Sequence, residues 1–165
     1  MVGMHVVEGS FASGANANFK IALLASRFNE LVVKELISGA HDWLIRMGVQ
    51  VGNITVVRVP GAFELGHIAR EIAHSGKVDG IVALGCIIRG DTAHFEFVAQ
   101  AANAGLQQVS VSTSVPVSFG VLTVENLDQA LARAGSKAGN KGAEAAQALV
   151  EILNLKLALK AWGQT

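Results

Sequence analysis

Apolar runs that alternate with helix-like stretches are the feature that most limits how this chain can fold. Four mainly apolar runs are separated by stretches whose apolar residues recur at helical spacing. Runs that are continuously apolar, instead of alternating with polar residues, are typical of strands buried on both faces of a parallel sheet. The strands are predicted over residues 19–25, 53–59, 78–88 and 109–122, the last with Pro116 inside it.

The stretches between these runs predict helices that cover the sheet on both faces. An open α/β sandwich with a mostly parallel sheet is therefore the expected fold class. Residues 1–18 mix glycine, serine, asparagine and alanine, which predicts an extended or loosely held N-terminal arm, while 19–165 are expected to form a single domain. The helices are predicted over residues 29–48, 62–76, 92–109, 125–135 and 142–162.

Charge and hydropathy exclude some classes of function. Thirteen Lys and Arg balance thirteen Asp and Glu, and only 16% of the residues are charged. Because the chain has no basic stripe, nucleic acid is not an expected partner. Apolar residues make up 51% of the chain and the mean hydropathy is +0.43. A neutral chain this apolar favours association, so a homo-oligomer is expected.

The single cysteine and the charged residues of the last helix bear on location. Cys86 excludes an internal disulfide and a cysteine-based zinc cluster, and it fits a reducing compartment. A cytoplasmic location is therefore expected. The N-terminus shows no basic region, apolar stretch and cleavage site of a secretory signal. Glu151, Lys156 and Lys160 interrupt the most apolar helix, so no membrane span is expected.

The most informative loop follows the third predicted strand, at the edge where open α/β sheets bind ligands. Within ALGCIIRGDTAHFEF (83–97), Asp91 and Thr92 precede a helix. Amides beside glycines and the positive end of a helix dipole suit a phosphate, and Arg89 would add charge. An NTPase phosphate loop needs lysine where this chain has Asp91, which excludes that class. Simple helix capping by Asp91 and Thr92 stays open as the alternative.

The histidines suggest two kinds of chemistry, proton transfer and metal binding. His94 lies in the first turn of the helix after this loop, where an imidazole can transfer a proton near neutral pH; a structural or capping role stays open. His67, Glu71 and His74 share one helix face at a spacing that a divalent metal can use. Without cysteine, an HExxH motif or a further carboxylate, that face is interpreted as a polar exterior or an interface, and no metal is expected.

Three other loops carry candidate binding residues, each with a plainer alternative. In SRFNE (26–30), Phe28 can stack on a heterocycle or pack under its loop. In VPGAFE (59–64), Phe63 can line a pocket, and Glu64 can do so or simply complement the helix dipole. In RAGSKAGNKG (133–142), Arg133 can reach an anion held by another loop or another subunit, or belong to a solvated basic turn.

Taken together, these loops resemble one known family. The segments SRFNE, VPGAFE, GCIIRGDTAHFEFV, PVSFGVLT and RAGSKAGNKG, in this order and at these intervals, resemble 6,7-dimethyl-8-ribityllumazine synthases over roughly residues 18–160. The resemblance implies a three-layer, flavodoxin-like α/β sandwich. It also implies a transferase of riboflavin biosynthesis that condenses 5-amino-6-(D-ribitylamino)uracil with 3,4-dihydroxy-2-butanone 4-phosphate, releasing phosphate and water. Such enzymes need no cofactor or metal.

The resemblance also implies a role for each matching residue. His94 matches the proton donor, and Phe119 falls where the family reaches into the neighbouring subunit's site. The phosphate is expected at Asp91, Thr92 and Arg133. The pyrimidine and its ribityl chain are expected at Phe28, Ala62, Phe63, Glu64, Cys86, Ile87 and Ile88. Asn29, Lys137 and Lys141 are expected to support these sets.

The resemblance also implies an oligomeric state, and the sequence departs from the family pattern in places. The family forms pentamers, and the short SKAGNK turn resembles that of members that close into 60-subunit shells; riboflavin synthase is an expected partner. Where the family very often has Pro, this chain has Gly66, which predicts a looser helix start. The Asp91 carboxylate is expected to turn away from the phosphate. The competing classes are a non-catalytic flavin or lumazine carrier, a purely structural shell protein and an archaeal-type riboflavin synthase.

Overall fold

A four-stranded parallel sheet forms the middle of the molecule. The computed structural model describes residues 3–164. The strands lie in the order β2-β1-β3-β4, and every neighbouring pair is parallel. The two central strands are buried almost throughout, which is why their sequences are continuously apolar. The strands are β1 (Ile21–Ser26), β2 (Ile54–Val59), β3 (Gly80–Ile88) and β4 (Val117–Val124).

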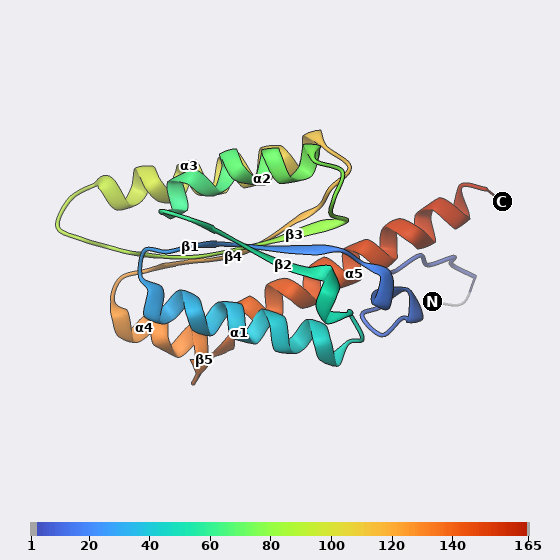
Figure 1. Ribbon diagram of the computed structural model, residues 1–165, viewed down its shortest axis with the longest axis horizontal. Coiled ribbons are helices and arrows are strands. Elements are labelled where there is room, and N and C mark those ends of the chain that lie inside the picture. Colours follow the sequence, from blue (N-terminus) through green and yellow to red (C-terminus); the bar gives the residue numbers. More distant parts are fainter. Residues whose placement is uncertain (1–2, 165) are drawn as a thin grey trace.

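Helices cover both faces of this sheet, which confirms the three-layer α/β prediction. Figure 1 shows α2 (Leu65–His74) and α3 (His94–Ser112) on one face. The other face carries α1 (Glu30–Arg46), α4 (Leu127–Arg133) and α5 (Lys141–Trp162). None of the described helices is long and apolar enough to cross a membrane.

Alternate residues of each central strand feed two separate cores. Ile21 and Leu23 of β1 pack into the core beneath α1, α4 and α5, whereas Ala22 and Leu24 pack into the core beneath α2 and α3. All four side chains are at most 1% exposed. Successive strand residues point to opposite faces, so a strand between two helical layers needs apolar residues at every position.

Two glycines let helices approach each other closely. A Cβ on Gly142 at the start of α5 would lie 2.1 Å from the carbonyl oxygen of Leu36 in α1. A Cβ on Gly66 in α2 would lie 2.8 Å from the Cα of Gly105 in α3. Instead of a loose helix start, Gly66 therefore has a packing role, because even one methyl group does not fit between the two backbones.

The N-terminal segment packs against α5 and the end of α1. Asn16, within the 3-10 helix η1 (Gly14–Asn18), is fully buried, and its amide donates to the carbonyls of Phe11 (2.8 Å) and Met47 (2.9 Å). The side-chain amide of Asn154 in α5 donates to the side-chain oxygen of Asn16 at 2.9 Å. The rings of His5 and Trp162 meet edge to face, with centroids 6.5 Å apart. These contacts hold much of the described part of the arm in place.

Several boundaries differ from the sequence prediction, including the start of α2 at Leu65, three residues later than expected. The apolar stretch over 109–122 is helical as far as Ser112, and β4 begins only after Pro116. Helix α3 begins at His94, two residues later than expected. The segment after α4 contains a small antiparallel pair, β5 (Ala134–Ser136) and β6 (Gly139–Asn140), where a plain turn was expected.

Candidate active site

Loops at the carboxyl edge of the sheet enclose a pocket of about 560 Å³. It lies between the loops that follow β1, β2 and β3 and the first turn of α3, which is the place expected for a ligand of an open α/β sheet. The pocket brings together nine of the predicted residues: Phe28, Asn29, Ala62, Phe63, Glu64, Ile87, Ile88, Thr92 and His94.

The loop after β1 is held by its neighbours on both sides. The Phe28 amide donates to the Pro60 carbonyl at 3.1 Å, and the Asn29 side-chain amide donates to the Cys86 carbonyl at 2.8 Å. Asn29 has a φ of 58°, a left-handed conformation that asparagine tolerates better than most residues. Phe28 is 73% exposed at the pocket. The alternative in which Phe28 packs under its loop is therefore wrong.

The loop after β2 presents a second aromatic ring. Ala62–Glu64 form the 3-10 helix η3, in which Ala62 is buried and Phe63 is 62% exposed. A Glu64 carboxylate oxygen accepts from the Gly61 amide at 2.8 Å, so this carboxylate satisfies a backbone donor as well as lining the pocket. Two exposed rings on neighbouring loops give the pocket apolar walls able to contact a flat heterocycle.

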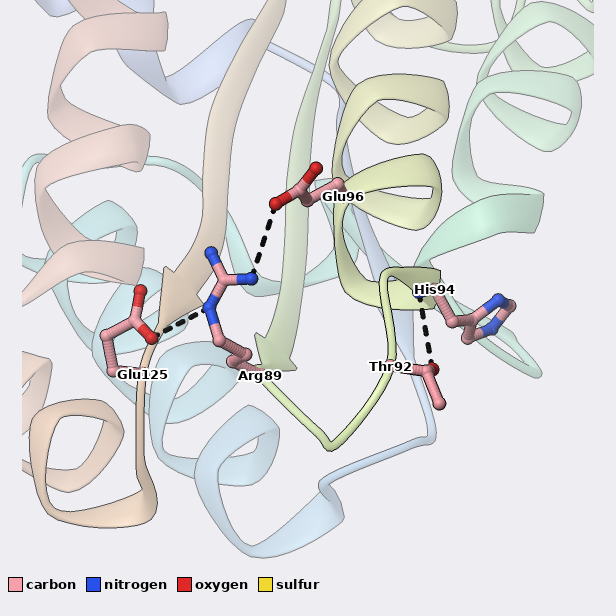
Figure 2. A network of polar contacts seen from close by, with 5 residues as sticks. All are labelled: Arg89, Thr92, His94, Glu96 and Glu125. Carbon is pink, nitrogen blue, oxygen red and sulfur yellow. Dashed lines mark hydrogen bonds and ion pairs between the residues drawn. The ribbon is translucent and has the colours of Figure 1, made fainter.

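The loop after β3 carries the polar residues. The Thr92 hydroxyl accepts from the His94 amide at a long 3.4 Å, and no side chain caps α3 at its N-cap residue, Ala93. Asp91 is exposed and has no capping bond among the described residues, so the alternative in which Asp91 simply caps the helix is wrong. Figure 2 shows the His94 ring pointing away from Arg89, on the side of α3 that faces the pocket.

Arg89 does not join the pocket as a free cation. Its guanidinium donates to Glu125 and Glu96, and it is absent from the described lining residues. The expectation that Arg89 adds charge to the anion site is therefore wrong, because two carboxylates engage it on the other side of the loop.

Cys86 lies behind the pocket and is 3% exposed. Burial raises the pKa of its thiol from the ordinary 9.0 to about 11. The carbonyl of Cys86 holds Asn29, while its side chain packs into the core. Cys86, Ile87 and Ile88 were all expected among the residues that bind the pyrimidine and its ribityl chain; Ile87 and Ile88 line the pocket, and Cys86 does not.

This burial predicts a pH dependence of stability. Since the folded state holds the thiol proton more tightly than the unfolded state, the contribution of Cys86 is full below about pH 9 and is lost as the pH rises towards 11. We expect urea unfolding to show a steeper loss of stability between pH 9 and 11 in the wild type than in a Cys86→Ala variant. Identical slopes in the two proteins would contradict the expectation.

The remaining predicted residues lie mostly on a second surface. A groove of about 640 Å³ between the exposed edge of β4 and α5 is lined by Phe119, Arg133 and Lys141 among others. Arg133 ends α4 and donates to the Gln129 carbonyl at 3.1 Å, while Lys141 pairs with Glu144 at 2.6 Å. Lys137 is exposed next to the β5-β6 pair and lines neither surface. Within one chain, the candidate phosphate residues Thr92 and Arg133 are thus not brought together.

Comparison with known proteins decides the family. The family model described as 6,7-dimethyl-8-ribityllumazine synthase matches residues 18–157. Proteins of that name from Nitratidesulfovibrio vulgaris, strains DP4 and Hildenborough, are each 49% identical over 155 residues, covering 94% of this chain and 97% of the relative. The chain belongs to the 6,7-dimethyl-8-ribityllumazine synthase family.

The position of the pocket, at the carboxyl edge of the parallel sheet, agrees with membership of the lumazine synthase family. Sequence reasoning missed four lining residues, Gly61, Gly90, Phe95 and Val98. Phe95 and Val98 are three residues apart on α3, a spacing that places both on the same helix face, so the helical pattern held the signal. Within residues 3–164, no group of three or more His, Cys, Asp or Glu is placed to hold a metal ion.

Proposed function

We propose that this protein condenses 5-amino-6-(D-ribitylamino)uracil with 3,4-dihydroxy-2-butanone 4-phosphate to give 6,7-dimethyl-8-ribityllumazine, releasing phosphate and water. The observation that carries this proposal is one pocket that combines two exposed aromatic rings with a hydroxyl and an imidazole, in a chain of the lumazine synthase family. Neither a cofactor nor a metal takes part in the proposed reaction.

Different parts of the pocket are proposed to bind the two substrates. Phe28 is proposed to stack on the pyrimidine, with Ile87 and Ile88 at its edge. Ala62, Phe63 and Glu64 are proposed to contact the ribityl chain. The first turn of α3, with Thr92 and the backbone at Asp91, is proposed to receive the phosphate, because amides at a helix N-terminus point towards an anion.

His94 is proposed to move the protons that the chemistry requires. The 5-amino group attacks the ketone to give a carbinolamine, which loses water to form an imine. Phosphate then leaves by β-elimination, and the enol left behind becomes a ketone. The second amine attacks this ketone and closes the ring with loss of a second water. Each of these steps transfers a proton, and His94 lies on the wall of the pocket in which the substrates are proposed to bind.

A second copy of the chain is proposed to complete the site. A departing phosphate dianion needs a cation, yet no lysine or arginine is among the described residues that line the pocket. Arg133, Lys141 and Phe119 lie together in the groove beside the open edge of β4. Placing this groove against a neighbour's pocket brings cation and phosphate loop together, and Lys137 on its hairpin is proposed to support them.

Repeating such a head-to-tail contact with rotation closes a ring. We propose a pentameric ring, and a 60-subunit shell built from twelve such rings. The single buried thiol fits a cytoplasmic location, and riboflavin synthase is the proposed consumer of the product. Light scattering and electron microscopy of the purified protein test the assembly.

The decisive experiment is an absorbance assay for lumazine formation from the two purified substrates. We expect the lumazine chromophore to appear well above the spontaneous rate. A protein that binds a lumazine or flavin tightly without accelerating its formation would instead be a carrier, and the proposed function would be wrong.

Loss of His94 is expected to slow the reaction only moderately. Both substrates react without help, so most of the acceleration should come from holding them together. We expect His94→Ala to lower kcat by about tenfold, below the range of 10²–10⁴ usual for general acid-base catalysis. His74→Ala, at the exposed end of α2, is the matched control. A His94→Ala protein without detectable activity would contradict this view.

A further inference from the structure

Arg89 is the centre of a polar network behind the pocket. Its Nε donates to the Glu125 carboxylate at 2.8 Å, and its Nη1 donates to the Glu96 carboxylate at 3.4 Å (Figure 2). The guanidinium carbon also lies 4.4 Å from the centre of the Phe95 ring. Two partners in α3 and one in the segment after β4 therefore hold one side chain that follows directly after β3.

Through these contacts Arg89 anchors both ends of the loop over residues 90–93. Its backbone amide donates to the Val124 carbonyl at 2.9 Å, which fixes the start of the loop on the end of β4. Its side chain fixes the end of the loop, because Glu96 and Phe95 lie in the first turn of α3. The loop has little of its own to hold it, since the Thr92 contact to the His94 amide is long.

Phe95 connects this network to the pocket. The ring lines the pocket, while the guanidinium covers it from behind. Figure 2 shows Glu96 and His94 leaving the first turn of α3 on different sides, the former towards Arg89 and the latter away from it. Because His94 belongs to the turn that Arg89 contacts, a shift of this turn would move His94 relative to the pocket.

The charges around Arg89 also support a role for this residue in holding the loop. Glu125 belongs to the segment between β4 and α4, where its own amide donates to Gln129. The guanidinium lies between Glu125 and Glu96 and offsets two negative charges beside the candidate phosphate loop. The hydrogen bond to Glu125 raises the pKa of Arg89 above its ordinary value and outweighs the smaller, opposite effect of desolvation. Arg89 thus stays charged throughout the working pH range.

We propose that Arg89 is a positioning residue for the reaction: held by Glu125, it fixes the first turn of α3 so that Thr92 and His94 meet the four-carbon phosphate. This inference rests on the proposed function. It assigns Arg89 no contact with substrate. It predicts that changes at Arg89 act on the phosphate substrate and spare the pyrimidine, whose proposed contacts lie on the loops after β1 and β2.

The test compares steady-state kinetics of Arg89→Met and Arg89→Lys with the wild type. For Arg89→Met we expect KM for the four-carbon phosphate to rise about tenfold, because small misplacements of positioned groups are costly. The KM for the pyrimidine should stay within about twofold, and the pH profile should keep its shape because Arg89 does not titrate. Arg89→Lys should recover part of the loss, since an ammonium can bond one carboxylate at a time.

A matched control removes an ion pair elsewhere. Arg46 pairs with Asp42 at 2.9 Å on the exposed surface of α1, so Arg46→Met loses a comparable contact without touching the loop. Equal rises in both KM values, together with a lower melting temperature, would assign Arg89 a purely structural role and overturn the proposal. Unchanged kinetics in Arg89→Met would overturn it as well.

A binding measurement separates this inference from the proposed function. Titration calorimetry with inorganic phosphate on the assembled protein should show several-fold weaker binding in Arg89→Met than in Arg46→Met. Equal phosphate affinity in the two variants would count against Arg89. If the wild type binds phosphate but forms no lumazine, the proposed function is wrong. The phosphate affinities of Arg89→Met and Arg46→Met would then still decide whether Arg89 positions the phosphate loop.

Discussion

Alanine in place of Arg133 is expected to lower kcat/KM for the four-carbon phosphate by about 10²–10³, the range seen when a group that stabilises developing charge is removed. The physical reason is that no cation lines the described pocket, so the proposed site depends on Arg133 from a neighbouring copy. Lumazine absorbance at varied concentrations of each substrate measures the effect. The loss should fall on the phosphate substrate and leave assembly intact.

A mixing experiment tests whether the site is shared. Phe28→Ala damages the pocket and Arg133→Ala damages the groove, so neither variant alone should be active. If the two are unfolded and reassembled together in equal amounts, about one quarter of the sites combine an intact pocket with an intact groove. Recovery of roughly that fraction of wild-type activity is expected. Mixed assemblies as inactive as their parents would show that pocket and groove act within one chain.

The largest effect on stability is expected from Gly142→Ala. The added Cβ would lie 2.1 Å from the Leu36 carbonyl oxygen and 2.8 Å from the Leu36 carbonyl carbon, both backbone atoms that cannot swing aside. Either α5 or α1 must shift, which we expect to cost about 3 kcal/mol, at the upper end of overpacking effects. For a domain of this size that lowers the melting temperature by about 6–12 °C.

Gly52→Ala is the matched control for this substitution. Gly52 lies in the 3-10 helix η2 (Val51–Asn53), and nothing lies within 4 Å of the position of its added Cβ. Its melting temperature should equal or slightly exceed that of the wild type, because alanine restricts the unfolded chain. Both variants are compared at one protein concentration, since assembly stabilises by mass action. A Gly142→Ala protein that melts with the control would refute the packing argument.

The sheet could be predicted from the sequence because its signal is local and strong. Each central strand serves two cores, and this requirement leaves the continuous apolar runs seen at β1 and β3. The pocket could be located for a related reason, since parallel strands bring their following loops to one edge. The sequence therefore marks Phe28 and His94 as candidates without any knowledge of their contacts.

What the sequence could not provide depends on long-range contacts. The stretch VSVSTSV over 109–115 was expected to begin a strand, yet Val109 is buried as part of α3, and the helix continues to Ser112. The partners of Arg89 come from a turn 7 residues away and a loop 36 residues away, so no local pattern marks them. Likewise, the separation of Arg133 from Thr92 follows from the placement of α4.

The packing of the N-terminal segment on α5 also determines where the chain can be opened or extended. Both ends of the described chain lie together at the edge of the sheet opposite the pocket (Figure 1), with His5 against Trp162. A short linker could join the two ends, so we expect a circular permutant opened at an exposed loop to keep the same fold. A protein or tag fused to either end would extend from the edge of the sheet opposite the pocket. The fold is therefore suited to carrying a fused protein without blocking the pocket of its own subunit.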